Sequence, residues 1–297
     1  MLLFILPPLE RMARELACVT GLERGRFTCG RFPNGELYMS VDSPVSGQPC
    51  MALGSISPPD ENLLSTLLLC HTLAKEKGVG ITALLPYLAY ARQDRVEAGK
   101  SLGSAWVGEM LWASNVDEVV AFDVHSAAIY TLYPVPLRSL SPAPLFAAKI
   151  KELGLQEATP VAPDEGAIQR CEEVREAACM PVPVAYLEKS RTPEGVRHSL
   201  LHGQAGRQAI VVDDILDTGS TLVSCCEQLQ RAGVQEITVF VTHGLFTGTL
   251  WQKLWSLAVR RIYCTDTVAL PPEVLAAPVT CLSIAPLLKE FLIKAAA

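Results

Sequence analysis

The sequence predicts an α/β protein of two similar domains, each a mainly parallel sheet flanked by helices. Short runs rich in Val, Ile and Leu alternate with longer amphipathic segments, as in parallel sheets that are covered on both faces. A similar pattern of acid, apolar strand and histidine-containing tip occurs twice, in residues 117–127 and 235–245. The 297 residues are 49% hydrophobic and 19% charged, which is enough apolar side chain for a substantial buried core.

The chain begins with a short apolar run that breaks at Pro7 and Pro8, which predicts a first strand followed by a helix. Apolar runs bounded by polar turns predict further strands at residues 51–55, 81–88, 118–123, 160–163, 183–187, 209–213, 236–242 and 261–264. The segments between them predict helices at residues 60–76, 104–114, 144–153, 166–177, 220–232 and 248–256. The proline-rich segment 133–144 separates the two halves, so we expect domains at residues 1–140 and 141–297.

Net charge and cysteine content limit the classes of binding partner and indicate the cellular compartment. The formal net charge of -6 argues against non-specific binding of nucleic acid, which requires a basic face. Ten scattered cysteines without a C-x-x-C motif indicate reduced thiols and a cytoplasmic protein. The first residues have no basic lead-in typical of a signal peptide, and no apolar run reaches the length of a membrane span. We therefore expect neither nucleic acid nor a membrane as a partner.

Residues 210–222, "IVVDDILDTGSTL", begin as a buried strand and end as the start of a helix. The adjacent acids Asp213 and Asp214 repel each other, so they require a place where something else supplies hydrogen-bond donors. Glycine permits close backbone approach, and a helix N-terminus presents N–H groups to an anion. We interpret the following residues as a phosphate cradle and the two acids as acceptors for sugar hydroxyls: Asp217, Thr218, Gly219, Ser220 and Thr221. The alternative is an ordinary helix N-cap.

Four apolar residues, two acids and D-T-G-x-T resemble the phosphoribosyl-pyrophosphate-binding motif of the type I phosphoribosyltransferase fold. Further stretches resemble the ribose-phosphate pyrophosphokinase family, and they occur in that family's order across nearly the whole chain: "RFPNGELYMSV" (31–41), "PYLAYARQDR" (86–95), "DVHSAAI" (123–129), "VAPDEGAIQR" (161–170) and "YLEKSR" (186–191). The resemblance implies two phosphoribosyltransferase-like domains, the second of which carries the ribose-phosphate-binding loop.

The resemblance also implies roles for single residues. It implies an ATP site made by Asn34, Gly35, Glu36, Arg92 and Gln93. It implies that Asp213, Asp214 and residues Asp217 to Thr221 bind ribose 5-phosphate, and that His125 and Asp164 bind Mg²⁺. Lys189 and Arg191 match the catalytic lysine and its arginine partner, at the start of a polar run that we interpret as a mobile flap. The plainer alternatives are a charged turn at "ARQDR", a polar strand end at His125 and a surface hairpin at Lys189.

The activity that the resemblance implies is transfer of a pyrophosphoryl group from ATP to the C1 hydroxyl of ribose 5-phosphate, giving phosphoribosyl pyrophosphate and AMP. Mg²⁺ would be the cofactor. The chain would assemble as a homo-oligomer, either a dimer or a hexamer. The alternatives are a phosphoribosyltransferase that consumes this product and a non-catalytic regulatory paralogue. The "NGE" and "ARQDR" elements favour the synthetase over the first, and His125, Lys189 and Arg191 favour it over the second. The continuation "VEAGKSLGSA" and the archaeal-type "PDEGAIQR" leave control by phosphate or ADP open, together with the nucleotide donor and the exact sugar phosphate.

Overall fold

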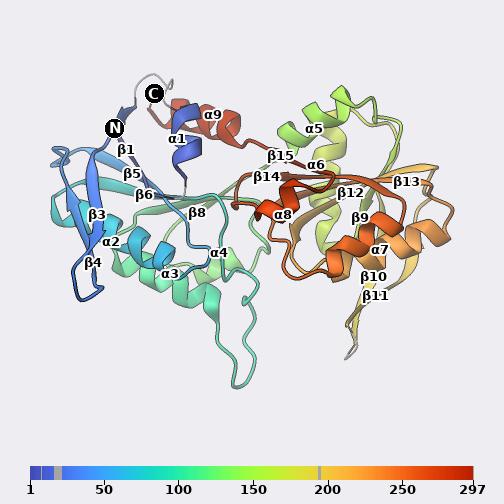
Figure 1. Ribbon diagram of the computed structural model, residues 1–297, viewed down its shortest axis with the longest axis horizontal. Coiled ribbons are helices and arrows are strands. Elements are labelled where there is room, and N and C mark those ends of the chain that lie inside the picture. Colours follow the sequence, from blue (N-terminus) through green and yellow to red (C-terminus); the bar gives the residue numbers. More distant parts are fainter. Residues whose placement is uncertain (8, 17–21, 193–194, 297) are drawn as a thin grey trace. The chain divides into compact units, whose positions relative to one another are not determined.

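The computed structural model describes residues 1–7, 9–16, 22–192 and 195–296 (Figure 1). The chain packs as two compact units, Met1–Leu140 with Ala285–Ala297 and Ser141–Ile284. The sequence placed residues 285–297 in the second domain, whereas helix α9 (Ala285–Ala296) packs against α1 (Glu10–Leu16) in the first unit. The apolar stripe of an amphipathic helix shows that it covers a sheet, but it does not say which sheet.

The first unit is built on a six-stranded parallel sheet with the strand order β2-β1-β5-β6-β7-β8. Its strands are β1 (Leu2–Ile5), β2 (Glu23–Arg24), β5 (Pro49–Leu53), β6 (Val79–Leu85), β7 (Glu118–Phe122) and β8 (Leu137–Leu140). In Figure 1, α1 and α9 cover one face, and α2 (Glu61–Lys75), α3 (Gly103–Ala113) and α4 (Ile129–Leu132) cover the other. Strands β3 (Phe27–Arg31) and β4 (Leu37–Val41) form a separate antiparallel hairpin.

The second unit is built on a seven-stranded sheet with the order β11-β10-β9-β12-β13-β14-β15, in which only β10 and β11 pair antiparallel. Its strands are β9 (Thr159–Ala162), β10 (Ala185–Thr192), β11 (Gly195–His202), β12 (Gln208–Leu216), β13 (Glu236–Gly244), β14 (Val259–Thr265) and β15 (Val279–Leu282). One face is covered by α5 (Ala143–Glu152) and by α6 (Ile168–Ala178), which follows the short 3₁₀ turn η1 (Glu165–Ala167). The other is covered by α7 (Ser220–Arg231), the 3₁₀ helix η2 (Leu250–Ser256) and α8 (Pro272–Leu275).

Alternation along β12 divides the apolar core of the second unit into two layers. Ile210 and Val212 pack with residues of α5 and α6, whereas Ala209 and Val211 pack with residues of α7 and η2. Successive side chains of a strand point to opposite faces of the sheet. The continuous apolar run that predicted this strand therefore reflects burial on both faces, as expected for a parallel sheet.

On one side of its first strand each sheet has the same order, β1-β5-β6-β7-β8 in the first unit and β9-β12-β13-β14-β15 in the second, while the other side carries β2 or the β10–β11 hairpin. This confirms the predicted fold class of two similar, mainly parallel domains. By position in the order, β6 corresponds to β13 and β7 corresponds to β14. The similar patterns of residues 117–127 and 235–245 lie on β7 and β13, which hold different places in their sheets. An acid followed by an apolar run and a polar tip describes many buried parallel strands, whichever place they hold in the sheet.

Several elements differ from the predictions. The proline-rich segment contains strand β8, the predicted helix at 248–256 is the 3₁₀ helix η2, and the polar stretch after residue 188 forms most of the β10–β11 hairpin. Strands β3, β4 and β15 were also missed, because they are short or half-exposed and lack a strong apolar signal. Over the part of the chain that the structure describes, no helix is both long enough and apolar enough to span a bilayer.

Candidate functional site

Two acids of β12 lie at the carboxyl end of the second sheet and are almost fully buried. Asp213 is 7% exposed and Asp214 is 6% exposed. The Asp214 backbone N–H donates a hydrogen bond of 3.0 Å to Asp213 Oδ1, and Asp214 Oδ2 lies 3.8 Å from Arg170 Nη2 on α6. Because side chains alternate along the strand, Asp213 faces the α7 layer while Asp214 faces the α6 layer.

A third acid, Asp164, belongs to the same cluster, which we call the acid cluster: Asp164, Asp213 and Asp214. Burial raises the pKa of Asp213 well above its usual range, and the charges of Asp214 and Asp164 raise it further, while Arg170 opposes them. Ionisation of Asp213 is therefore disfavoured in the protein alone. Its ionised form is favoured by a ligand that brings positive charge or hydroxyl donors, which is the physical reason to regard the acid cluster as a binding site.

The loop after β12 leads directly into α7, and glycine occupies the N-cap position. Gly219 has φ 88°, and a Cβ built on it would lie 2.7 Å from the Trp251 Cα atom. Thr218 Oγ1 lies 3.4 Å from the Ser220 backbone nitrogen, at the long limit of a hydrogen bond. Glycine at the N-cap itself offers no side-chain cap, and the interpretation of this loop as a phosphate cradle stays a prediction. The N–H groups of the first turn of α7 have no intrahelical partner and can serve an anion.

A segment to which the sequence assigned no role at the site holds this loop in place. The backbone N–H groups of Leu245 and Phe246 donate to Leu216 O at 2.8 and 3.1 Å, and that of Thr247 donates to Asp217 O at 3.0 Å. Trp251 is 3% exposed and donates from Nε1 to Gly248 O at 3.0 Å. The connection between β13 and η2 thus supports the cradle. The glycines of "HGLFTG" were the signal that could have indicated a tight turn here.

The predicted catalytic residues Lys189 and Arg191 lie on β10, within the β10–β11 hairpin at the edge of the sheet. Lys189 pairs with His198 and Arg191 pairs with Val196, after a register shift between Leu187 and Lys189. In Figure 1 the hairpin extends beyond the helices of its unit. The polar run is thus a hairpin, as the plainer alternative held, and its predicted mobility stays a prediction. Residues 193 and 194 and the side chains of Lys189 and Arg191 lie outside the described part.

In the first unit, Arg92 and Gln93 lie on the loop that follows β6. Gln93 Oε1 accepts a hydrogen bond from Ser101 Oγ at 2.8 Å, and Ser104 N–H donates to Gln93 O at 3.2 Å. Ser126 Oγ donates to Asp94 Oδ2, which joins this loop to the one that follows β7 and carries His125. The structure therefore brings the "ARQDR" segment and the His125 segment together at the carboxyl edge of the first sheet.

Asn34, Gly35 and Glu36 form the exposed turn of the β3–β4 hairpin rather than part of that edge. Gly35 has φ 92°, and the Glu36 N–H donates to Asn34 Oδ1 at 3.2 Å. Their role toward ATP stays a prediction.

The two predicted metal-binding residues lie in different units, Asp164 in the second and His125 in the first. Among the described residues, no group of three or more His, Cys, Asp and Glu side chains is arranged to hold a metal ion. Magnesium commonly uses one or two carboxylates and completes its shell with water and substrate phosphates. The donor chemistry of Asp164 fits such an ion, whereas an imidazole is an unusual ligand for it.

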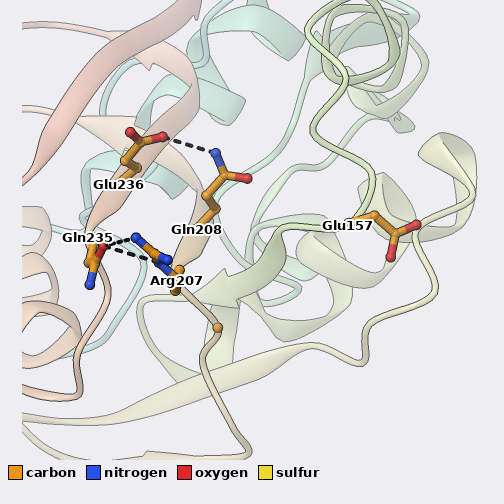
Figure 2. A pocket seen from close by; sticks show the side chains of 6 residues that line it. Glu157, Arg207, Gln208, Gln235 and Glu236 are labelled. Atoms are coloured by element: carbon orange, nitrogen blue, oxygen red, sulfur yellow. Dashed lines mark hydrogen bonds between the residues drawn. The ribbon is translucent and has the colours of Figure 1, made fainter.

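A shallow pocket of about 520 Å³ lies at the opposite, amino edge of the second sheet (Figure 2). Arg207 Nη2 donates to Gln235 Oε1 at 2.7 Å, and Gln208 Nε2 donates to Glu236 Oε2 at 3.0 Å. Figure 2 shows these side chains turned toward one another. Their polar groups are thus engaged with each other, and we assign no ligand to this pocket.

Comparisons with known proteins agree with this architecture. The N-terminal domain of ribose phosphate pyrophosphokinase matches residues 1–114, and the phosphoribosyl synthetase-associated domain matches residues 161–292. The chain is 28% identical to the ribose-phosphate pyrophosphokinase of Bacillus caldolyticus, over 97% of this chain and 92% of the relative. It is also 28% identical to ribose-phosphate pyrophosphokinase 1 of Streptococcus agalactiae, over 98% of this chain and 92% of the relative.

The crystal structure of phosphoribosylpyrophosphate synthetase from Mycobacterium smegmatis is similar to this chain over nearly its whole length. The TM-score is 0.86 at 27% sequence identity, and the match covers 99% of this chain and 98% of the other. Both domain matches, the full-length relatives and the shared fold bear out the resemblance that the sequence motifs suggested. The chain belongs to the ribose-phosphate pyrophosphokinase family.

Proposed function

We propose that the protein transfers the pyrophosphoryl group of ATP to the C1 hydroxyl of ribose 5-phosphate, forming phosphoribosyl pyrophosphate and AMP. The observation that carries this proposal is the acid cluster, with Asp213 and Asp214 buried, beside the glycine-capped N-terminus of α7. Carboxylates that accept hydrogen bonds from hydroxyl groups, next to N–H groups that bind an anion, suit a sugar phosphate. The names of the full-length relatives support the same reaction.

Ribose 5-phosphate is held in the second unit in this proposal. Its phosphate accepts hydrogen bonds from the N–H groups at the start of α7 and from the hydroxyls of Thr218, Ser220 and Thr221. Asp213 and Asp214 accept hydrogen bonds from the ribose hydroxyls, which favours their ionised form. The close fit of Gly219 against Trp251 keeps the loop in the conformation that presents these groups.

ATP is held by residues of the first unit in this proposal: Asn34, Gly35, Glu36, Arg92 and Gln93. The Arg92 guanidinium suits phosphate oxygens, because its planar donors can bind two of them at once. Asp164 and His125 are the proposed contacts for Mg²⁺. When bound, magnesium would supply positive charge that offsets the negative charge of the triphosphate.

The chemical step joins the C1 oxygen of the sugar to the β-phosphorus of ATP and breaks the bond between that phosphorus and the oxygen that AMP retains. The C1 hydroxyl loses its proton to solvent as the new bond forms. Lys189 and Arg191 stabilise the negative charge that develops on the phosphoryl oxygens. Catalysis is then mostly positioning and electrostatic stabilisation, as is usual in phosphoryl transfer.

The two alternative functions fit less well. A phosphoribosyltransferase has no need for the first unit, yet the match to the N-terminal pyrophosphokinase domain spans residues 1–114. A regulatory paralogue has no need for His125, Lys189 and Arg191 together. We further propose a cytoplasmic protein that assembles as a homo-oligomer, a dimer or hexamer. None of the described cysteines forms a disulfide, which suits a reducing compartment.

One assay separates the three functions. The purified protein is incubated with ATP, Mg²⁺ and ribose 5-phosphate, and AMP is measured with and without the sugar. We expect AMP to form only when ribose 5-phosphate is present. A phosphoribosyltransferase would leave ATP intact but consume added phosphoribosyl pyrophosphate with a nucleobase, and a regulator would do neither.

Arg92→Ala tests the ATP half of the proposal. We expect the KM for ATP to rise by roughly tenfold or more, since a charge-assisted contact to phosphate is lost, while the KM for ribose 5-phosphate stays close to the wild-type value. Lys100→Ala is the control, because Lys100 lies on the same loop and already pairs with Glu97. Equal effects of Arg92→Ala on both KM values, or none on either, would make "ARQDR" a structural turn.

A further inference from the structure

The hairpin that carries Lys189 is attached to the helix that begins the phosphate cradle. The His198 backbone N–H on β11 donates to Ser224 Oγ of α7 at 3.0 Å. Gln228 Nε2 of the same helix donates to the His198 carbonyl oxygen at 2.9 Å. Both backbone groups of one strand residue are therefore bound by side chains of α7, and the His198 side chain is itself 3% exposed.

The two α7 side chains lie on one stripe of the helix that begins in the cradle. Ser220, Ser224 and Gln228 are spaced four residues apart, which places them on the same face. Ser220 is the first residue of α7, next to the N-cap Gly219. The N-terminus of α7 thus forms the proposed anion site, and the helix face that carries Ser220 also carries the two side chains that hydrogen-bond the hairpin.

His198 is the residue that pairs with Lys189 across the hairpin. Strand β11 is an edge strand, and an edge strand presents unpaired backbone groups that a protein must cover. At His198 this cover is provided by hydrogen-bonding side chains rather than by another strand. Fixing His198 on α7 fixes the backbone opposite Lys189 relative to the start of the cradle, since antiparallel partners lie within about 5.5 Å of each other.

We propose that Ser224 and Gln228 are positioning residues for the reaction, which hold the Lys189-bearing strand in register with the ribose 5-phosphate cradle. This inference rests on the proposed function. It assigns the two residues no contact with substrate. Their effect reaches the reaction through the backbone of His198, so their loss acts on turnover and leaves the cradle itself in place.

The test compares variants that remove one hydrogen bond with variants that keep it. Gln228→Glu keeps the size of the side chain but removes the N–H donor, and Ser224→Ala removes the hydroxyl. We expect each to lower kcat by roughly tenfold, as the loss of one well-placed hydrogen bond would. The KM for ribose 5-phosphate should change by less than about twofold, since the cradle groups are untouched.

Two matched variants serve as controls. Ser224→Thr retains the hydroxyl and should restore kcat to near the wild-type value. Gln230→Glu makes the same chemical change on the exposed side of α7 and should leave kcat unchanged. Amide hydrogen exchange gives an independent readout: residues 185–192 and 195–202 should exchange faster in Gln228→Glu than in Gln230→Glu.

Wild-type kcat in both Gln228→Glu and Ser224→Ala would overturn the proposal. So would a rise in the KM for ribose 5-phosphate with kcat unchanged, because it would make the two residues supports of the cradle alone. If the wild-type protein formed no AMP, the proposed function would fall separately. The attachment of the hairpin would then be judged by hydrogen exchange, and unchanged exchange in Gln228→Glu would overturn it.

Discussion

Lys189→Ala is expected to lower kcat by roughly 10²-fold or more, the scale seen when one electrostatic stabiliser of a transition state is removed. A cation that acts chiefly on the transition state lowers kcat and kcat/KM together when it is lost, so both KM values should change little. Steady-state rates of AMP formation, measured with each substrate varied in turn, give kcat and the KM for each substrate separately. The melting temperature should barely move, because Lys189 lies on a hairpin at the edge of the sheet.

Lys253→Ala is the control for this experiment, since Lys253 is an exposed lysine of the same unit on η2. It should behave like the wild type in every parameter. Near-normal turnover in Lys189→Ala would remove the catalytic assignment that the resemblance implies. It would also weaken the case against a regulatory paralogue, because that case depends on Lys189, Arg191 and His125.

Gly219→Ala is expected to raise the KM for ribose 5-phosphate by roughly tenfold or more, which corresponds to about one lost charge-assisted hydrogen bond. The new Cβ atom would lie 2.7 Å from Trp251 Cα, so either the loop or the η2 backbone must shift. The same substitution puts a side chain at φ 88°, a conformation that costs a non-glycine residue about 1 kcal/mol. The KM for ATP should stay near its wild-type value.

Gly233→Ala separates these two effects. Gly233 follows the other end of α7 with φ 93°, and a Cβ atom there would meet nothing within 4 Å. It should therefore lower the melting temperature through backbone strain alone, with no change in either KM. If Gly219→Ala lowered the melting temperature as Gly233→Ala does but left the KM for ribose 5-phosphate unchanged, the cradle would not be at this loop.

Much of the second unit could be predicted from local sequence. The apolar run before Asp213 predicted β12, because a strand buried on both faces needs an uninterrupted set of apolar side chains. The acids at its end predicted a binding edge, since a core has no use for two adjacent carboxylates. The structure places both acids there, buried and close to Asp164.

The features that sequence reasoning missed depend on contacts between distant segments. The local sequence "KSRTPEGVRHSLLH" does not distinguish a loop from a hairpin. In the structure the two strands are fixed by the Lys189–His198 pairing and by hydrogen bonds with Ser224 and Gln228 of α7. The support of the cradle by Thr247 and Trp251 was likewise invisible, because it depends on backbone hydrogen bonds and on the space beside Gly219. The sequence did not determine which of the two units α9 packs in, because this too depends on contacts between distant segments.

The central claim is that a pyrophosphoryl group moves intact from ATP to the C1 oxygen of ribose 5-phosphate. Phosphorus-31 NMR of the complete reaction mixture tests it most directly, because it identifies both products without a coupling enzyme. We predict AMP and a sugar diphosphate in equal amounts, with the diphosphate coupled to the proton at C1 and the 5-phosphate unchanged. ADP with a singly phosphorylated C1, free pyrophosphate, or no change in ATP in the presence of Mg²⁺ would contradict the account.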